Sequence, residues 1–498
     1  MLFAILWAPA AARELSITDY GAVPGGANNA TAAFENGKAL YDAMRAARKG
    51  DVVVVPSQRF VMVPYAPLYG LEHVELRLEG CLAAFEPTGE HAKVWPFYLG
   101  NFESLITIHL SSHVTVSGGG ALDGRGHNWW VAFARNKLAS KRPMLLQIDG
   151  STDVVVRDIT MLDSPRFNLY LGSYCKRVLV ERVTILADWA AQAALQKSVP
   201  MFPFNTDGID VAGEDITIRD IVVSNYDDVV AVKAADLLSD KTGAVPGCTQ
   251  NVTVSNTTVY RGAGLSVGSV HPSPLKPCVR DVLFERATLW SPLKGPYVKP
   301  DRATPECLHL DHDACSASIS NVTYSHIRMH GSFVDGTSPP GWDLYESFHR
   351  AKALAPDARF AFQRTAVGRR LQATSLKKMK CGARDYPCMM WPLYLGPQQQ
   401  LEPSGKGSGL WADPEPRVDV KDVSFIDVKA HSGSWPAAAA VVRCPRSNPC
   451  SGLVFEDVSL DANVFGKGRA YVCDHRDAAF GVVAGERAPD AADCVAAA

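Results

Sequence analysis

The chain has 498 residues, of which 47% are hydrophobic and 20% are charged, and its 50 Lys and Arg residues nearly balance 52 Asp and Glu residues. This composition is typical of a globular protein and excludes a disordered or collagen-like chain. A formal net charge of −2 argues against a general nucleic-acid or membrane-surface binder, and no apolar run is long enough to span a membrane. We therefore expect neither nucleic acid nor a membrane as a partner, and we expect a monomer.

Residues 1–12 predict a short signal peptide. They are apolar and end in three alanines, as a signal-peptidase site does, although the usual positive start is missing. A buried first strand is the alternative interpretation. Residues 13–498 would then form the mature domain.

Twelve cysteines also indicate a secreted protein. None of them lies in a C-x-x-C pair, which argues against a zinc ribbon and against thioredoxin-type chemistry. The close pairs Cys381/Cys388 and Cys444/Cys450 fit short disulfide loops. Four sequons are compatible with glycosylation, at Asn29, Asn251, Asn256 and Asn321.

Residues 19–49, which include an Ala-rich stretch at 32–48, predict an N-terminal helix. After this helix a short pattern occurs ten times. Each copy begins with a residue that is usually polar, continues with alternating apolar residues, and resumes the alternation after a polar break. The copies begin at His73, His113, Asp153, Arg177, Asp215, Asn251, Asp281, Asn321, Asp422 and Gly452. Period-two alternation that is rich in Val, Ile, Thr and Phe indicates strands with one buried face.

The spacing of these copies predicts the fold. Apart from one gap they lie 24 to 40 residues apart, and no helical pattern separates them. A β-sandwich or a propeller also has regularly spaced strands, but the variable spacing and the scarcity of hairpin turns disfavour both. We predict an all-β fold: one right-handed, single-stranded parallel β-helix, capped at its open end by the N-terminal helix.

The exceptional gap lies between Asn321 and Asp422 and indicates an insertion at about 332–390. Within 331–390 there are ten Lys and Arg residues but only five Asp and Glu residues, and 342–354 predicts a short helix. The insertion is either a basic lid over a site for a polyanion or a solvated surface excursion.

Acidic residues gather where two adjacent coils should meet. Asp207 lies in the segment NTDGID at 205–210, and Asp227 and Asp228 follow about one coil later, so that their side chains can share a face. Glycoside hydrolysis needs one protonated carboxyl group and one ionised carboxylate, and mutual repulsion raises the pKa of one member of such a group. From the spacing alone, exposed turns remain an alternative.

Several collinear segments resemble the polygalacturonase family, glycoside hydrolase family 28, over most of the chain. These segments are TDYGA (18–22), GALDGRGHNWW (120–130), Ser164-Pro165 after Asp163 in place of Asn, NTDGID (205–210), YDDVVAVK (226–233), GLSVGS (264–269), CPRSNPC (444–450) and YVC (471–473). The resemblance implies a right-handed parallel β-helix of the pectin-lyase-like type, which agrees with the repeat.

The resemblance also implies roles for individual residues. Asp227 would be the general acid, while Asp207 and Asp228 would hold and deprotonate the water of a single-displacement, inverting hydrolysis. Asn205 would orient the cluster or contact sugar, and Lys299 would bind the carboxylate of the substrate. No metal and no organic cofactor is implied.

Two positions depart from the family pattern. The histidine of the Gly-His-Gly motif is replaced by Ala263, and the arginine of the Arg-Ile-Lys motif is replaced by Tyr297, which removes a bidentate fork for carboxylate. His271 could fill the vacancy or could be an ordinary loop residue. Trp129 and Trp130 could stack on sugar rings or belong to the core.

We therefore predict a secreted glycoside hydrolase that cleaves α-1,4-galacturonosyl linkages of an anionic, pectin-like polysaccharide. A polysaccharide lyase on the same fold is one alternative, although the aspartates fit water activation better. A catalytically impaired pectin-binding or wall-structural protein is another, because both the histidine and the arginine are missing.

Overall fold

The computed structural model describes a large part of the chain. The described residues are 12–25, 29–86, 95–98, 101–134, 137–138, 141–187, 205–235, 248–301, 307, 309–331, 391–396, 417–433, 440–444, 450–462, 471–474 and 494–496. Most of the predicted signal peptide, the predicted insertion at 332–390 with its helix, and the pair Cys381/Cys388 lie outside these residues. No helix within them is long and apolar enough to cross a membrane.

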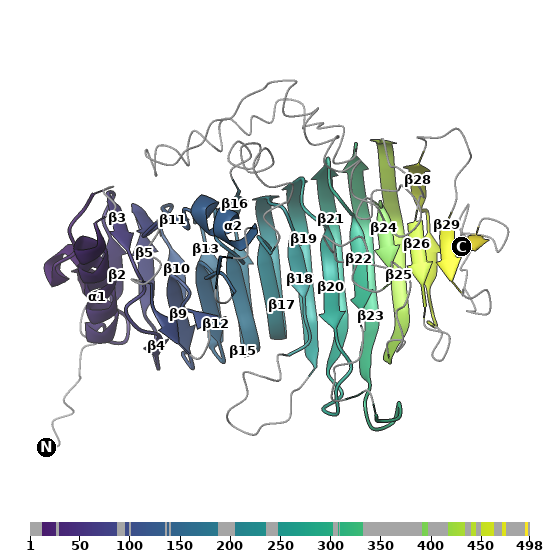
Figure 1. Ribbon diagram of the computed structural model, residues 1–498, viewed down its shortest axis with the longest axis horizontal. Helices are drawn as coiled ribbons and strands as arrows, with labels where there is room; N and C mark the ends of the chain where they lie inside the picture. The colour runs from purple at the N-terminus through teal and green to yellow at the C-terminus, as the bar shows by residue number, and fades with distance from the viewer. Residues whose placement is uncertain are drawn as a thin grey trace, which may run out of the picture.

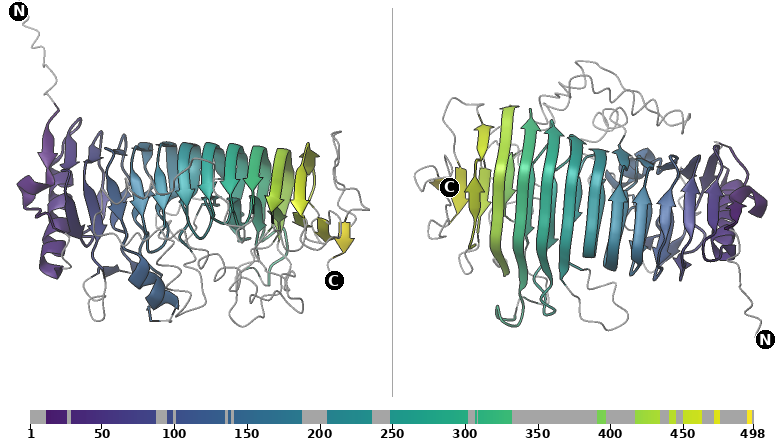
Figure 2. Two further views of the ribbon diagram at one scale, coloured as in Figure 1. Left: turned by 90° about the horizontal axis from the view of Figure 1, so that it is seen from above. Right: turned by 180° about the vertical axis from the view of Figure 1, so that it is seen from behind.

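Short parallel strands stack in coils along one axis, as Figures 1 and 2 show. The pairings form three columns. The first contains β1 (Glu14–Ser16), β2 (Val52–Val55), β5 (Glu75–Leu78), β10 (Thr115–Ser117), β13 (Thr152–Arg157), β15 (Leu169–Glu181), β17 (Ile209–Ser224), β19 (Thr249–Tyr260), β21 (Cys278–Trp290), β23 (Ala317–His330), β25 (Val418–Gly433) and β27 (Val454–Glu456).

The second column contains β3 (Arg59–Met62), β6 (Cys81–Ala84), β11 (Ala121–Asp123), β14 (Thr160–Leu162) and β16 (Thr184–Leu186), continues in the later halves of β17 to β25, and ends with β28 (Ser459–Ala462). The third contains β4 (Leu68–Tyr69), β9 (Ile106–His109), β12 (Leu146–Asp149), the first residues of β15 and β17, then β18 (Val230–Val232), β20 (Leu265–Val270), β22 (Pro296–Pro300), β24 (Leu393–Leu395), β26 (Ala440–Arg443), β29 (Tyr471–Asp474) and β30 (Cys494–Ala496). The predicted parallel β-helix is confirmed, with one antiparallel pair, β7 (Phe97–Tyr98) and β8 (Asn101–Phe102), beside it.

The starting residue of every sequence copy occupies the same corner of the coil, with a positive φ. This first corner column consists of His73, His113, Asp153, Arg177, Asp215, Asn251, Asp281, Asn321, Asp422 and Gly452. The polar break forms a second corner column, which consists of Asp158, Arg182, Asp220, Asn256, Arg286, His326, Asp427 and Asp457. Asn, Asp and Gly tolerate the left-handed region better than other residues, which explains why they recur there.

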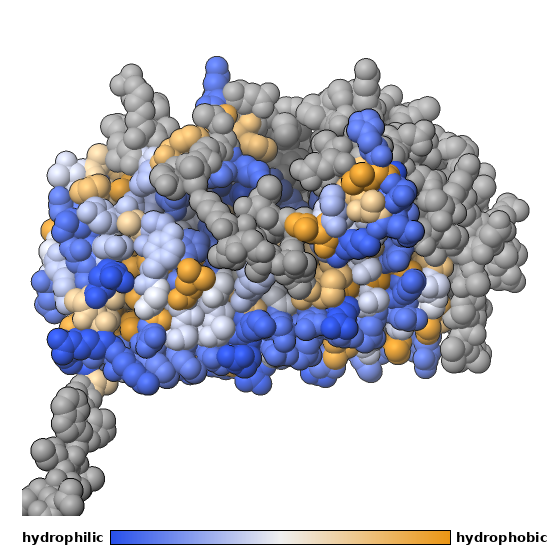
Figure 3. Space-filling view, turned by 90° about the horizontal axis from the view of Figure 1, so that it is seen from below, coloured by the Kyte–Doolittle hydropathy of each residue, from blue (hydrophilic) through white to orange (hydrophobic). Residues whose placement is uncertain are grey.

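Alternation along the strands fills the interior. Phe284, Tyr324, Phe425 and Phe455 stack in successive coils, with ring centroids 4.8 to 5.5 Å apart. Trp129 and Trp130 are 0% and 1% exposed, so they belong to the core and are not available for sugar stacking. Polar residues of the alternation remain outside, and Figure 3 shows a band of hydrophilic residues along the lower edge of that view.

Helix α1 (Ala30–Ala46) packs on η1 (Ile17–Tyr20) and β3 at the N-terminal end of the β-helix, which confirms the predicted cap (Figure 1). The side chain of Asn29 accepts hydrogen bonds from the first free N–H groups of α1. A second helix, α2 (His127–Ala134), was not expected from the sequence.

Three disulfides join described cysteines: Cys248–Cys278, Cys307–Cys315 and Cys444–Cys450. The last confirms the short loop expected at 444–450. Cys81 and Cys175 are buried as free thiols, and burial is the main reason that the pKa of Cys175 rises to about 12.

Candidate active site

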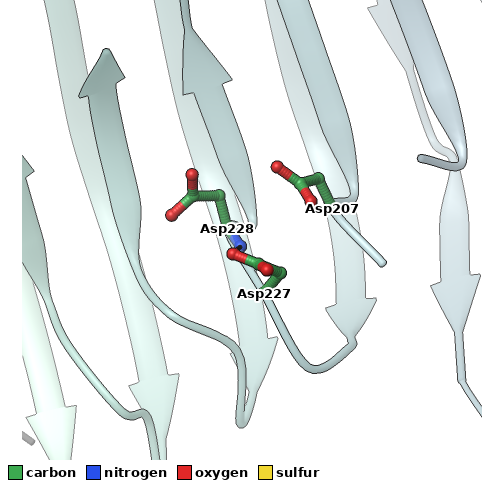
Figure 4. Close-up of side chains that lie close together, drawn as sticks. All are labelled: Asp207, Asp227 and Asp228. Carbon is green, nitrogen blue, oxygen red and sulfur yellow. Dashed lines mark hydrogen bonds between the residues drawn. The ribbon is translucent and has the colours of Figure 1, made fainter. Parts of the chain in front are cut away.

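The three aspartates of the acidic motifs converge at the start of neighbouring strands in the third column. Asp207 lies two residues before β17, and Asp227 and Asp228 lie just before β18. Ile209 of β17 pairs with Val230 of β18, which places Asp207 beside Asp228 on the next coil. Figure 4 shows the three side chains grouped together, and one oxygen from each lies within 4.8 Å of the others. The expected meeting of these carboxylates is therefore present.

Backbone N–H groups hold the carboxylate of Asp227. Its Oδ2 accepts a hydrogen bond of 2.7 Å from the backbone N–H of Asn205, and its Oδ1 accepts one of 2.9 Å from that of Asp228. Asp227 is partly exposed, whereas Asp207 and Asp228 are buried. Asp227 is therefore the member of the cluster that is open to a ligand.

Asp228 is held by two side chains from later coils. Its Oδ1 accepts a hydrogen bond of 2.7 Å from the hydroxyl of Ser266 in β20, and its Oδ2 forms an ion pair with Lys299 in β22. All three side chains are buried. The carboxylates lie close enough together to bind a cation, and the cation that Asp228 contacts is this ammonium group. A hydroxyl and an ammonium group therefore hold the two oxygens of Asp228 in place.

Asp207 belongs to a second charged group. Lys233 contacts Asp210 at 2.6 Å and lies 3.8 Å from Asp207. Burial opposes the charge of this lysine, but Asp210 and Asp207 raise its pKa overall. Lys233 therefore remains a cation beside the cluster.

Burial is the main reason that the pKa values of both Asp207 and Asp227 are raised. For Asp207 the charges of Asp210 and Asp227 add to this effect, and the rise is large. For Asp227 the charge of Asp228 adds to it, while the N–H of Asn205 and Lys299 oppose it. The cluster therefore favours holding a proton, as an acid/base pair requires.

Buried side chains beneath the cluster fix its loops. The amide of Asn225 donates to the backbone oxygen of Thr206 at 3.1 Å and to that of Asp228 at 2.7 Å, tying the two acidic segments together. Arg142 donates to the side chain of Asn205 at 3.5 Å. Asn205 therefore contacts Asp227 through its backbone N–H and this arginine through its side chain.

Tyr297, Ala263 and His271 are the remaining positions that the sequence singled out. Tyr297 is buried in β22, its ring centre lies 4.7 Å from the ammonium of Lys299, and it packs edge-on against Tyr394. Ala263 precedes β20 and donates its backbone N–H to the backbone oxygen of Asp227. His271 follows the far end of β20, where it is half exposed and 3.8 Å from Asp301. The strand separates His271 from Ala263, so the histidine does not fill the vacancy.

Sequence reasoning did not single out Asp210, Lys233, Ser266 or Arg142. The first three lie inside recognised motifs, but their contacts depend on the register between coils. Arg142 comes from a loop more than 60 residues before the acids in the chain. Only the folded arrangement of the coils brings it to Asn205.

Comparisons with known proteins agree with this fold. Residues 94–336 match the model described as glycosyl hydrolases family 28. A polygalacturonase of Juniperus ashei is 28% identical over 326 residues, which cover 63% of this chain and 54% of that protein. A polygalacturonase of Persea americana is 22% identical over 460 residues, which cover 90% and 74%. The alignment with the Juniperus protein thus spans about half of its length.

Solved structures share the fold. An endo-xylogalacturonan hydrolase from Aspergillus tubingensis superposes with a TM-score of 0.58 at 16% identity, covering 95% of this chain and 99% of its own. An exopolygalacturonase from Thermotoga maritima gives 0.55 at 14% identity, covering 95% and 92%. The fold is therefore a right-handed parallel β-helix, as predicted. The segment that matches glycosyl hydrolases family 28, residues 94–336, includes the acidic cluster and most of the central coils.

Proposed function

We propose that this protein is a secreted glycoside hydrolase that cleaves α-1,4-galacturonosyl linkages of a pectin-like polysaccharide by acid/base catalysis. The observation that carries the proposal is the convergence of Asp207, Asp227 and Asp228, whose environments differ. One carboxylate is paired with a buried ammonium, while burial favours a proton on the others. Relatives named polygalacturonase support the substrate class.

Asp227 would protonate the glycosidic oxygen as its bond to C1 breaks. Its partial exposure and the two N–H groups that fix its carboxylate support this role. Asp228, which contacts Lys299 and Ser266, would accept a proton from the water that attacks C1, and Asp207 would help to hold that water. The proton leaving water replaces the one that Asp227 donates, so the cluster is restored after proton exchange with solvent.

The spacing and the contacts of the carboxylates bear on the stereochemistry of the reaction. The closest carboxylate oxygens lie within 4.8 Å, nearer to the about 5–5.5 Å of retaining pairs than to the about 6.5–9.5 Å of inverting pairs. However, both oxygens of Asp228 are engaged, by Ser266 and by Lys299, which makes it a poor nucleophile for a covalent intermediate. This engagement supports single displacement, and the anomer of the first product decides the question.

An acidic sugar fits the charges around the cluster. Lys299, Lys233 and Arg142 all lie within reach of the aspartates or of Asn205, so cations outline the site. Desolvated cations discriminate in favour of carboxylate-bearing sugars over neutral ones. We infer a pectic, anionic polymer as the substrate.

A non-catalytic pectin-binding protein is the second candidate. The observation in its favour is that Ala263 and Tyr297 stand where the family pattern has histidine and arginine. Such a protein would bind polygalacturonate without releasing new reducing ends, even at high protein concentration.

The test is a reducing-sugar assay across a pectic panel, with proton NMR of the first product. Hydrolysis with inversion is expected. Unsaturated products that absorb in the ultraviolet would instead show a lyase, and tight binding without any product would show the binding protein. A retained anomer would overturn the single-displacement step alone.

Secretion is supported by three of the four sequons. Asn251, Asn256 and Asn321 are exposed in the corner columns, where a glycan would meet solvent. Expression through a eukaryotic secretory pathway should give protein in the medium whose mass falls after N-glycan removal. Retention of the whole product inside the cell would contradict secretion.

A further inference from the structure

Lys294 is a buried lysine that neither the motifs nor the acid/base roles explain. Its side chain is 0% exposed, two residues before β22. Its amino group has no hydrogen-bond partner in the described part of the chain, so its N–H donors are unpaired. Burying an ammonium without a partner costs free energy that an apolar residue of similar size would avoid. This cost points to a function for Lys294.

The register places Lys294 in line with two of the aspartates. Strands β17, β18, β20 and β22 follow one another in the third column. Their residues Ile209, Val230, Leu265 and Pro296 pair in that order. The residues two positions earlier are Asp207, Asp228, Ala263 and Lys294. Lys294 therefore lies in the coil that follows the vacancy at Ala263.

The aromatic rings around Lys294 place its charge near the second vacancy. Its Nζ lies 4.1 Å from the ring centre of Tyr297 and 5.7 Å from that of Tyr394. The ammonium of Lys299 lies 4.7 Å from the same Tyr297 ring. Two cations thus flank the tyrosine that replaces the family's arginine.

The charges that act on Lys294 come from the acidic cluster and from β22. Burial is the main reason that its pKa falls to about 7; Asp228 opposes this fall, Lys299 adds to it and Asp227 opposes it. Asp228 has a larger influence than Asp227. Lys299 is already paired with Asp228 and Lys233 with Asp210, whereas no described residue pairs with Lys294 in this way.

We propose that Lys294 is a positioning residue for the hydrolysis, whose buried positive charge keeps Asp228 ionised while Asp227 retains its proton. Resting on the proposed function, this assigns to Lys294 the electrostatic part of what the missing histidine and arginine would supply. Because Lys294 is in register with Asp228, whereas Asp227 lies one residue before that position, the ammonium would act unequally on the base and the acid and so separate their proton affinities. Lys294 acts through these carboxylates and touches no substrate.

The stability of a variant without the lysine distinguishes a positioning residue from a packing residue. Met has a similar length without the charge, so Lys294→Met should relieve the burial cost and raise stability. The folded pKa of Lys294 lies below that of an unfolded lysine, so the wild-type chain gains stability as pH rises from about 7 to about 10.4. The advantage of the variant should therefore be greatest below about pH 7 and should vanish near the upper end of this window.

The experiment compares pH profiles of kcat on polygalacturonate, and unfolding curves, for Lys294→Met, Lys294→Arg and wild type. Lys421→Met, an exposed lysine of β25, is the matched control. We expect Lys294→Met to shift the acid limb of the kcat–pH profile to a pH about one unit higher. On the acid side of the profile kcat should then fall about 10-fold, while KM changes little. Lys294→Arg should keep the limb near its wild-type position, and Lys421→Met should behave as wild type.

Two results would overturn the inference. An unmoved acid limb in a folded Lys294→Met enzyme would exclude the positioning role while leaving the hydrolase intact. Lower stability of that variant below about pH 7 would identify Lys294 as a packing residue, and this comparison requires no turnover. Failure of wild type on every pectic substrate would instead contradict the proposed function.

Discussion

Two ion pairs, one at a corner of the β-helix and one at the candidate active site, show how differently the same chemistry is used. Arg177 and Asp153 pair in the first corner column with 55% and 28% of their side chains exposed, and equivalent polar residues occupy the corner in coil after coil. Lys299 and Asp228 pair with only 4% of each exposed, across strands whose other coils carry different residues. The corner pair occupies positions that are polar in nearly every coil, whereas the buried pair occupies positions that carry other residue types in other coils.

This difference distinguishes the corner residues, which stabilise the fold, from the buried charges of the candidate active site. Exposed pairs contribute about 0–1 kcal/mol, so the corners owe their residue types mainly to the left-handed backbone. Buried charges are costly unless they are well paired, and several of them, Asp207, Asp228, Lys294 and Lys299, lie in or just before β17, β18 and β22. We therefore expect substitutions at the acidic cluster to change activity strongly, and substitutions at the corners to change only stability.

The largest expected effect follows Asp227→Asn. This change removes the proton donor but keeps the shape, so kcat should fall by about 10²–10⁴-fold. The circular dichroism spectrum should stay that of wild type, and the melting temperature should fall only slightly, because the amide keeps the shape of the side chain but its nitrogen cannot accept one of the two N–H bonds. A variant with near-wild-type turnover would refute the acid role.

Lys299→Met should give the largest loss of stability. It leaves the buried carboxylate of Asp228 without its cation, which costs about 3–5 kcal/mol in comparable buried pairs. Urea unfolding measures this loss. The double variant Lys299→Met/Asp228→Asn should recover a large part of it, and no recovery would mean that the two residues do not act as a pair.

Asp207→Asn should separate stability from activity through pH. Because the pKa of Asp207 is raised in the folded state, the folded chain binds more protons than the unfolded chain above about pH 4, and this residue's contribution to stability falls as pH rises. The variant should be inactive yet more stable than wild type at neutral pH. Thermal unfolding across pH tests this, and an equal loss of stability at every pH would contradict the burial argument.

The smallest effect is expected at a corner. Asp215 has a φ of 57° and lies next to Asn251 in the first corner column. Asp215→Val should destabilise the fold by about 1–2 kcal/mol, because a branched side chain is strained in this region. Asp215→Gly should cost less, and both variants should keep wild-type kcat. A Gly variant as unstable as the Val variant would show that the side-chain contact matters more than the backbone.

The corner residues also show why the fold could be predicted. His73, Asp153 and Asn251 begin copies of the pattern because each coil must turn at the same place with the same backbone conformation. Each copy of the pattern must therefore contain a residue that can adopt this conformation, and the sequence shows it. Helix α2 carries no such repeated signal, and it was missed.

The acidic cluster was predictable only in part. Asp207, Asp227 and Asp228 lie in recognised motifs about one coil apart, so their convergence followed from the spacing. The surroundings of these residues, such as Ser266 beside Asp228 and Lys294 in line with Asp207 and Asp228, depend on the register of coils up to 87 residues apart, counted from Asp207 to Lys294. No local pattern encodes that register, and the spacing between copies varies.

The most direct test of the central claim is digestion of polygalacturonate in water enriched with heavy oxygen, followed by mass spectrometry of the first products. If the cluster activates water, each new reducing end from the wild-type protein should carry one solvent oxygen, and Asp227→Asn should release almost none. Products without the label, or equal release by both proteins, would contradict hydrolysis at this cluster.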